Sequence, residues 1–185
     1  MWSRIPNALS ILRFLLTPLT LALIFQSRYW EALLVHAISG SSDFADGFIA
    51  RWFGCETRLG SFLDAASDKI YTLSIFCTLT YLGRCPTWYL ALLITVSWLQ
   101  STAVLLLHWK NRSRLAPNWI GKLCMTLQFI WAGAQLLDLS VGYLTSTVSL
   151  LGYCLLAGLL VMTFVKYFLQ SRNRLLPIAS PHLGA

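Results

Sequence analysis

Four aspartates lie close together in a sequence that contains few acidic residues. The chain has seven acidic residues, and four of the seven are aspartates between positions 43 and 68: Asp43, Asp46, Asp64 and Asp68. Residues three or four apart in a helix share one face, so each pair presents two carboxylates to the same side. Carboxylate oxygens are the ligands that hard divalent cations prefer. The spacing therefore predicts a metal site formed by two helices.

The apolar surroundings of these aspartates favour bound cations. One Asp at the centre of a membrane helix costs about 2.5–3.5 kcal/mol, so four would cost roughly 10–14 kcal/mol without compensation. A position near the membrane boundary lowers this cost, but the four like charges repel one another. Two Mg²⁺ or Mn²⁺ ions would neutralise the carboxylates, bind the phosphates of a substrate and stabilise charge during phosphoryl transfer.

The composition excludes a water-soluble protein and a disordered one. Only 11% of the 185 residues are charged and 57% are hydrophobic, whereas an average soluble domain has about 25% charged residues. The stretches Tyr89–Leu107 and Val141–Val165 contain no charged residue. A helix needs about 20 apolar residues to cross the hydrocarbon core of a membrane. We therefore expect an integral membrane protein with no separate soluble domain.

Turn-forming and charged residues divide the chain into six predicted helices. Their approximate ranges are 7–26, 29–53, 59–82, 87–109, 118–139 and 145–170. The predicted fold is all-α, a single membrane domain over residues 1–185 with six transmembrane helices in one bundle. The first aspartate pair then lies near the end of the second helix and the other pair near the start of the third. Two adjacent antiparallel helices would bring all four carboxylates to one membrane boundary.

The basic residues predict which end of the bundle faces the cytoplasm. The net charge is +7, and the cations lie between apolar stretches rather than on one face, which favours membrane topology over nucleic-acid binding. The only basic residues in the segments on the predicted outer side are Arg28 and Arg84. By the positive-inside rule, both termini and the aspartates are expected at the cytoplasmic side. We interpret residues 5–27 as a membrane span rather than a signal peptide, because Arg13 and Pro18 interrupt the apolar stretch.

Small residues accompany the aspartates. Gly47, Ala50 and Gly60 remove side-chain bulk from this region, which would let a nucleotide approach, although small residues also allow close packing of membrane helices. Arg51 is a candidate to bind phosphate, or else to pair with an aspartate. In chain order these residues form the motif Asp43-x2-Asp46-Gly47-x2-Ala50-Arg51-x8-Gly60-x3-Asp64-x3-Asp68.

This motif resembles the signature of the CDP-alcohol phosphotransferase family at every fixed position. Members of that family are six-helix membrane enzymes that cleave a CDP-activated alcohol and join its phosphoryl half to a second alcohol. The resemblance implies that the four aspartates hold two divalent cations and that Asp68 is also the general base on the acceptor hydroxyl. It further implies a nucleotide-binding set: Asn7, Gly47, Ala50, Arg51, Thr57 and Gly60.

Two other segments resemble particular branches of that family. Residues 6–13 read Pro-Asn-Ala-Leu-Ser-Ile-Leu-Arg, similar to the opening of phosphatidylglycerophosphate synthases and cardiolipin synthases. Asn7 and Arg13 would then lie near the nucleotide; alternatively, Asn7 caps a helix and Arg13 extends to the lipid headgroups. Residues 118–128 resemble a segment of the same two enzymes. Lys122 within it would receive the phosphate of glycerol-3-phosphate, or would only set topology.

The fourth predicted helix departs from the phosphatidylglycerophosphate synthases. Those enzymes usually have an Arg-acidic pair early in this helix, where this chain has the uncharged segment 97–100, Ser-Trp-Leu-Gln. Its basic residues lie later, and we take Arg112 and Arg114 as further acceptor-binding candidates. The departure leaves the aspartate motif intact, but it bears on the identity of the acceptor.

The predicted function is a step of phospholipid biosynthesis. The enzyme would transfer the phosphatidyl group of CDP-diacylglycerol to an alcohol, with glycerol-3-phosphate as the first choice, giving phosphatidylglycerophosphate and CMP. The alternative within the family is a cardiolipin-synthase-like transfer to phosphatidylglycerol. An ion or proton transporter would explain intramembrane aspartates but not the Gly, Ala and Arg spacing, and prenyltransferases use a differently spaced Asp motif.

The resemblance also sets expectations about partners and location. Membrane lipids and a second copy of the chain, in a homodimer, are the expected partners, and nucleic acid is not. From the short, minimal form of the chain we expect a bacterial inner membrane, with the active site facing the cytoplasm; the alternative is a mitochondrial membrane.

Overall fold

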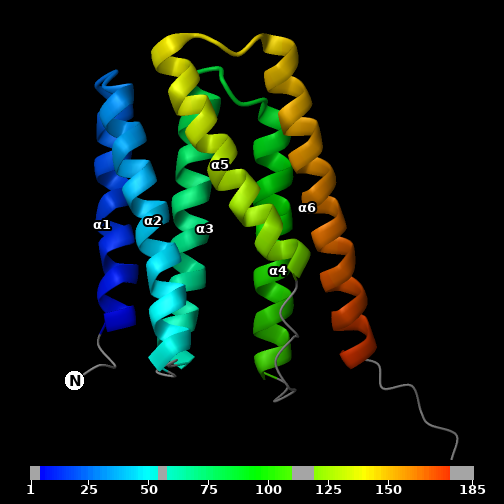
Figure 1. Cartoon of the computed structure of the whole chain (residues 1–185). Coiled ribbons are helices and arrows are strands. Elements are labelled where there is room, and N and C mark those ends of the chain that lie inside the picture. Colours follow the sequence, from blue (N-terminus) through cyan, green and yellow to red (C-terminus); the bar gives the residue numbers. More distant parts are fainter. Residues whose placement is uncertain (1–4, 54–57, 110–118, 176–185) are drawn as a thin grey trace, which may run out of the picture.

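The computed structural model describes residues 5–53, 58–109 and 119–175, with side chains described for 13–41, 66–102 and 119–170. The described residues form six helices and no strand: α1 (Ile5–Phe25), α2 (Tyr29–Phe53), α3 (Arg58–Tyr81), α4 (Thr87–Trp109), α5 (Trp119–Val141) and α6 (Ser146–Leu175). Figure 1 shows them as one set of long helices. The all-helical class and the order of helices are as expected, but α6 continues to Leu175 where the sequence analysis ended it near residue 170.

Local backbone chemistry determines where α1 and α3 end. At the end of α3, the N–H of Arg84 donates to the carbonyl of Leu79 (2.8 Å) and the N–H of Gly83 donates to that of Thr80 (3.0 Å). This is a Schellman motif, which places one residue in the left-handed region. Gly83 has φ 71° there and meets no Cβ penalty. Ser27, with φ 59°, has the same position after α1.

The helices pack in two groups, which α3 and α5 connect. α1 contacts α2 and α3, α4 contacts α3 and α6, and α5 contacts α2, α3 and α6. The core on the α4 side contains the buried rings of Phe76, Tyr89 and Tyr153 from α3, α4 and α6. The ring centroids of Phe76 and Tyr89 are 5.3 Å apart, and those of Tyr89 and Tyr153 are 5.0 Å apart. These contacts fix α4 and α6 against α3.

The outer surface of the bundle is apolar. Trp30, Leu34 and Ile38 form an exposed row along α2, each more than half exposed. Such a row is unfavourable in water and favourable against lipid. Among the described residues, two stretches are long and apolar enough to cross a membrane, Trp119–Val141 and Ser146–Gln170. The apolar surface and these two helices indicate a membrane protein. That all six helices cross the membrane stays a prediction.

An ion pair joins the α3–α4 turn to the last turns of α5, at the end of the bundle away from the N-terminus (Figure 1). Arg84, in the α3–α4 turn, donates through Nη1 to Oδ2 of Asp138 at 2.8 Å. Oδ1 of the same carboxylate accepts the backbone N–H of Leu144 at 2.6 Å. Asp138 is 2% exposed, so its charge needs these partners. Asp138 therefore stabilises a turn and is not part of the aspartate motif.

Candidate active site

The backbone places the two aspartate pairs on consecutive helices at one end of the bundle. Asp43 and Asp46 lie in the last turns of α2, and Asp64 and Asp68 in the first turns of α3. The connection between Phe53 and Arg58 spans at most about 18 Å when fully extended. Figure 1 shows the end of α2 and the start of α3 at the end of the bundle where α1 begins.

Most of the predicted site lies outside the described side chains. This applies to Asn7, Asp43, Asp46, Gly47, Ala50, Arg51, Gly60 and Asp64, which are within described helices. Thr57, Arg112 and Arg114 lie outside the described residues altogether. The metal, nucleotide and acceptor roles of these residues stay predictions, and the described part of the site consists of Asp68, its neighbours and Lys122.

Asp68 forms an ion pair with Arg13. Nη1 of Arg13 on α1 donates to Oδ1 of Asp68 on α3. The side chain of Arg13 is 7% exposed and that of Asp68 is 30% exposed. A guanidinium that extends to lipid headgroups keeps its charge at the surface, so the headgroup alternative for Arg13 is wrong. Its charge instead compensates and orients the carboxylate that the sequence analysis named as the general base.

Lys69 follows Asp68 and binds a different helix. Its Nζ donates to Oγ of Ser101 at 2.8 Å and approaches the carbonyl of Ser97 at 3.4 Å, both on α4. Burial lowers the stability of an uncompensated ammonium, and these two oxygens solvate it. The sequence analysis found that segment 97–100 of α4 contains no charge and did not connect this segment with Lys69. Only the packing of α3 on α4 shows that a cation reaches it.

The segment around Lys122 has two polar groups in different surroundings: the ammonium of Lys122 is exposed and the amide of Gln128 is buried. Lys122 is exposed in the first turn of α5, a position from which its ammonium can meet an anion. Gln128 is 3% exposed, and its Nε2 donates to the hydroxyl of Tyr89 at 3.2 Å. The amide therefore connects α5 with α4, and Lys122 stays the acceptor-binding candidate of this segment.

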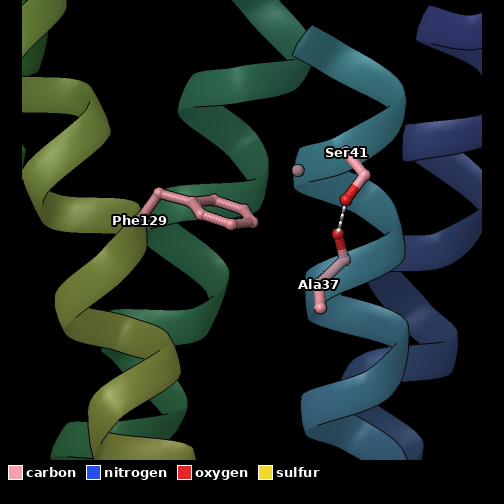
Figure 2. Close-up of a pocket in the computed structure, with 4 residues that line it drawn as sticks. Ala37, Ser41 and Phe129 are labelled. Atoms are coloured by element: carbon pink, nitrogen blue, oxygen red, sulfur yellow. Dashed lines mark hydrogen bonds between the residues drawn. The ribbon is translucent and has the colours of Figure 1, made fainter. Parts of the chain in front are cut away.

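A cavity of about 400 Å³ lies between α2 and α5, lined by Ala37, Gly40, Ser41 and Phe129. Figure 2 shows the Phe129 ring directed toward α2. Oγ of Ser41 donates to the carbonyl of Ala37 at 2.9 Å. The described lining thus contains one hydroxyl and no charged group, which suits the uncharged part of a lipid or an alcohol. The cavity lies on α2 just before Asp43 in the chain.

Gly40 is required by the close approach of the Phe129 ring. A Cβ at position 40 would lie 2.4 Å from Cε1 and 2.5 Å from Cζ of Phe129. The ring stacks on His36 at a centroid distance of 3.9 Å, so it has little freedom to move aside. Gly40→Ala should therefore lower the free energy of unfolding by about 1–3 kcal/mol.

The measurement is the thermal unfolding midpoint of the purified protein in detergent, followed by tryptophan fluorescence. Gly158→Ala on α6 is the matched control, because a Cβ there meets no atom within 4 Å. Ala in an exposed helix interior is favoured over Gly by up to about 1 kcal/mol, so this variant should melt no lower than the parent. Equal midpoints for the two variants would contradict the proposed contact.

The donor set of the predicted metal site fits a hard cation. All four candidates are carboxylates, which select Mg²⁺ or Mn²⁺ over softer metals. Among the residues whose side chains are described, no three carboxylate, imidazole or thiol groups lie together, since three of the four candidates are outside that set. Asp68, paired with a buried cation through one oxygen, is compatible with a shared ligand role.

Known proteins resemble this chain over most of its length. The family model described as CDP-alcohol phosphatidyltransferase matches residues 3–165. The human cardiolipin synthase (CMP-forming) is 29% identical over 186 residues, covering 91% of this chain and 62% of the human protein. A cardiolipin synthase (CMP-forming) of Streptomyces coelicolor is 34% identical over 157 residues, covering 80% of this chain and 72% of the relative.

A relative of the other expected activity is equally similar. The probable phosphatidylglycerophosphate synthase of Mycobacterium tuberculosis is 29% identical over 171 residues, covering 89% of this chain and 80% of the relative. The chain spans about three fifths of the human protein's length, 62%. The family match includes the whole aspartate motif, Arg13 and Lys122. This chain belongs to the CDP-alcohol phosphatidyltransferase family.

Proposed function

We propose that this protein transfers the phosphatidyl group of CDP-diacylglycerol to an alcohol and releases CMP. The observation that supports this best is the pair of Asp68 and Arg13, which places a charge-compensated and partly exposed carboxylate at the last position of the aspartate motif of a family member. A carboxylate that accepts a proton must reach its substrate and keep a fixed orientation. The exposed part of the Asp68 side chain and its contact with Arg13 support this role.

In the proposed reaction, Asp68 takes the proton of the acceptor hydroxyl as its oxygen attacks the phosphorus nearest the diacylglycerol. A bond forms between that oxygen and the phosphorus, and the diphosphate bond to CMP breaks, so that CMP leaves with the bridging oxygen. Asp43, Asp46, Asp64 and Asp68 would hold two Mg²⁺ or Mn²⁺ ions, which when bound offset the charge of the diphosphate. Such reactions depend on alignment and charge stabilisation, to which Arg13 contributes through Asp68.

Glycerol-3-phosphate is the acceptor that we propose. Lys122 is an exposed cation at the start of α5, where it can bind the phosphate of a small anionic alcohol. Arg112 and Arg114 are candidates for the same phosphate. The name of the Mycobacterium tuberculosis relative, a probable phosphatidylglycerophosphate synthase, supports this choice.

Phosphatidylglycerol is the second candidate acceptor, for which cardiolipin would be the product. Two observations favour it: the relatives named cardiolipin synthase, and the absence of charge from the described lining of the cavity between α2 and α5. The uncharged lining that these four described residues provide suits a lipid better than a small phosphate ester.

We also propose the arrangement in the membrane. All six helices would cross it, with both termini and the aspartates at the cytoplasmic face of a bacterial inner membrane, and two copies would form a homodimer. The positions of the basic residues support the orientation, and the exposed apolar row on α2 supports a lipid-facing surface.

The deciding experiment measures CMP release by the purified protein with CDP-diacylglycerol, Mg²⁺ or Mn²⁺, and one acceptor at a time. Release with glycerol-3-phosphate, and phosphatidylglycerophosphate found by mass spectrometry, is the expected result. Release with phosphatidylglycerol alone would replace the first candidate by the second. No release with either acceptor, together with ion transport by proteoliposomes, would refute the transferase proposal.

A further inference from the structure

Three aromatic groups from three helices, two buried and one partly buried, meet near the proposed site. His36 on α2 is 3% exposed and Tyr71 on α3 is 2% exposed. Nδ1 of His36 lies 2.7 Å from the hydroxyl oxygen of Tyr71, and Nε2 lies 3.1 Å from the backbone carbonyl oxygen of Phe129 on α5. The imidazole also stacks on the Phe129 ring, with an interplanar angle of 11°. The proposed reaction assigns no task to this group.

The two partners determine the protonation of the imidazole. A carbonyl oxygen can only accept a hydrogen bond, so Nε2 of His36 is the nitrogen that bears the proton. In the neutral ring, Nδ1 is then an acceptor and the hydroxyl of Tyr71 is the donor to it. Both ring nitrogens are thus satisfied without a charge. One side chain joins α2 to α3 through its Nδ1 and α2 to α5 through its Nε2.

Each member stands at a fixed helical distance from a residue of the proposed site. Asp43 follows His36 by seven residues, about two turns of α2, and Tyr71 follows Asp68 by three residues, less than one turn of α3. Phe129 follows Lys122 by seven residues on α5. A helix is a rigid element over two turns. Hydrogen bonds between these residues therefore fix how far each of the three helices is shifted along its axis at the proposed site.

Two glycines allow the helices to approach around this group. A Cβ at Gly40 of α2 would clash with the Phe129 ring. A Cβ at Gly133 of α5 would lie 3.3 Å from Cδ2 and 3.5 Å from Nε2 of His36, which is tight. Small residues on both sides of the contact therefore give His36 the space in which it reaches the carbonyl of Phe129.

We propose that His36 is a positioning residue, whose hydrogen bonds to Tyr71 and to the carbonyl of Phe129 hold α2, α3 and α5 in the register that the transferase site requires. The inference rests on the proposed transfer reaction. What is new is the alignment: a single neutral imidazole aligns α2 and α3, which supply the carboxylates, with α5, which supplies Lys122.

The test compares variants of the purified full-length protein. His36→Phe keeps a ring for stacking and removes both nitrogens, and Tyr71→Phe removes one hydrogen bond. Tyr89→Phe is the matched control, because it removes the hydroxyl of another fully buried tyrosine, which accepts from Gln128. His36→Gln is the rescue variant, since its amide offers both an N–H donor and an oxygen acceptor.

We expect kcat for CMP release to fall about tenfold or more in His36→Phe and Tyr71→Phe. Losses of this size occur when a residue that orients metal ligands without binding the metal is removed. The KM for CDP-diacylglycerol should change less than about threefold, which separates lost alignment from lost binding. His36→Gln should recover part of kcat. Tyr89→Phe should keep kcat within about threefold of the parent. This should hold even if Tyr89→Phe and Tyr71→Phe lower the melting midpoint equally, which separates lost alignment from lost stability.

A second measurement does not depend on turnover. Mn²⁺ binding in the absence of substrate, followed by electron paramagnetic resonance, should weaken about threefold or more in His36→Phe and not in Tyr89→Phe. Unchanged Mn²⁺ affinity in His36→Phe would overturn the positioning role. If the parent releases no CMP with any acceptor, the transfer reaction is refuted, while the Mn²⁺ comparison still decides whether His36 aligns the carboxylate helices.

Discussion

Asp68→Asn should reduce CMP release by about a thousandfold or more, since a positioned general base contributes roughly 10²–10⁴ to a rate and the same carboxylate is a proposed cation ligand. The substituted amide cannot take a proton from the acceptor hydroxyl. Its oxygen can still accept from Arg13, which is the partner of Asp68 in the structure. The fold should therefore be retained, and the measurement is kcat together with the unfolding midpoint.

The matched control for this variant is Asp138→Asn at the other end of the bundle. Asp138 is the ion-pair partner of Arg84 and is more deeply buried than Asp68, so this change should cost stability. It should leave kcat within about threefold of the parent, because the turn it stabilises lies at the opposite end of the bundle from the end of α2 and the start of α3. Activity of Asp68→Asn above about a tenth of the parent would refute the base assignment.

Arg13→Gln should lower kcat about 10–100-fold, the range seen when a group that orients a ligand or catalytic residue is removed. The glutamine keeps a hydrogen-bond donor but has no charge to compensate Asp68. Losing one partner of a buried ion pair costs up to about 3–5 kcal/mol, and the exposed part of Asp68, 30% of its side chain, lowers this cost. Kinetics and thermal unfolding measure the two effects separately.

Arg13→Lys tests the geometry of the same contact. Lysine keeps the charge but not the planar guanidinium, so kcat should recover only in part. Arg84→Gln is the matched control: it breaks an ion pair of the same type in a turn at the far end and should affect stability alone. Parent-like kcat in Arg13→Gln would contradict the orienting role, and an equal loss in Arg84→Gln would attribute the effect to stability.

The helices were predictable because they depend on local chemistry. Apolar stretches of membrane length form helices wherever the chain must satisfy its own backbone groups. The break after α3 was predicted from turn-forming residues, and Gly83 takes the left-handed conformation there. The end of α6 was predicted near residue 170 and lies at Leu175, five residues later. Arg172 and Arg174 are good helix formers, so polar residues do not end the helix before Leu175.

The contacts between helices were not predictable in the same way. The sequence analysis placed Arg13 near the nucleotide or among the headgroups, and the structure pairs it with a carboxylate 55 residues away. Lys69 reaches α4 across 32 residues. His36 had no predicted role and joins groups 35 and 93 residues distant. A side chain's partner on another helix depends on rotation and height of both helices, which local periodicity does not determine.

The sequence by itself determined the family, the aspartate motif and the six helices, because each follows from residue types at short and fixed spacings. The tertiary structure alone decided which charges and hydrogen bonds support the one described carboxylate of the motif. A buried Arg, Lys or His must find a compensating partner wherever packing places it, and that partner is selected by three-dimensional proximity rather than by position in the chain.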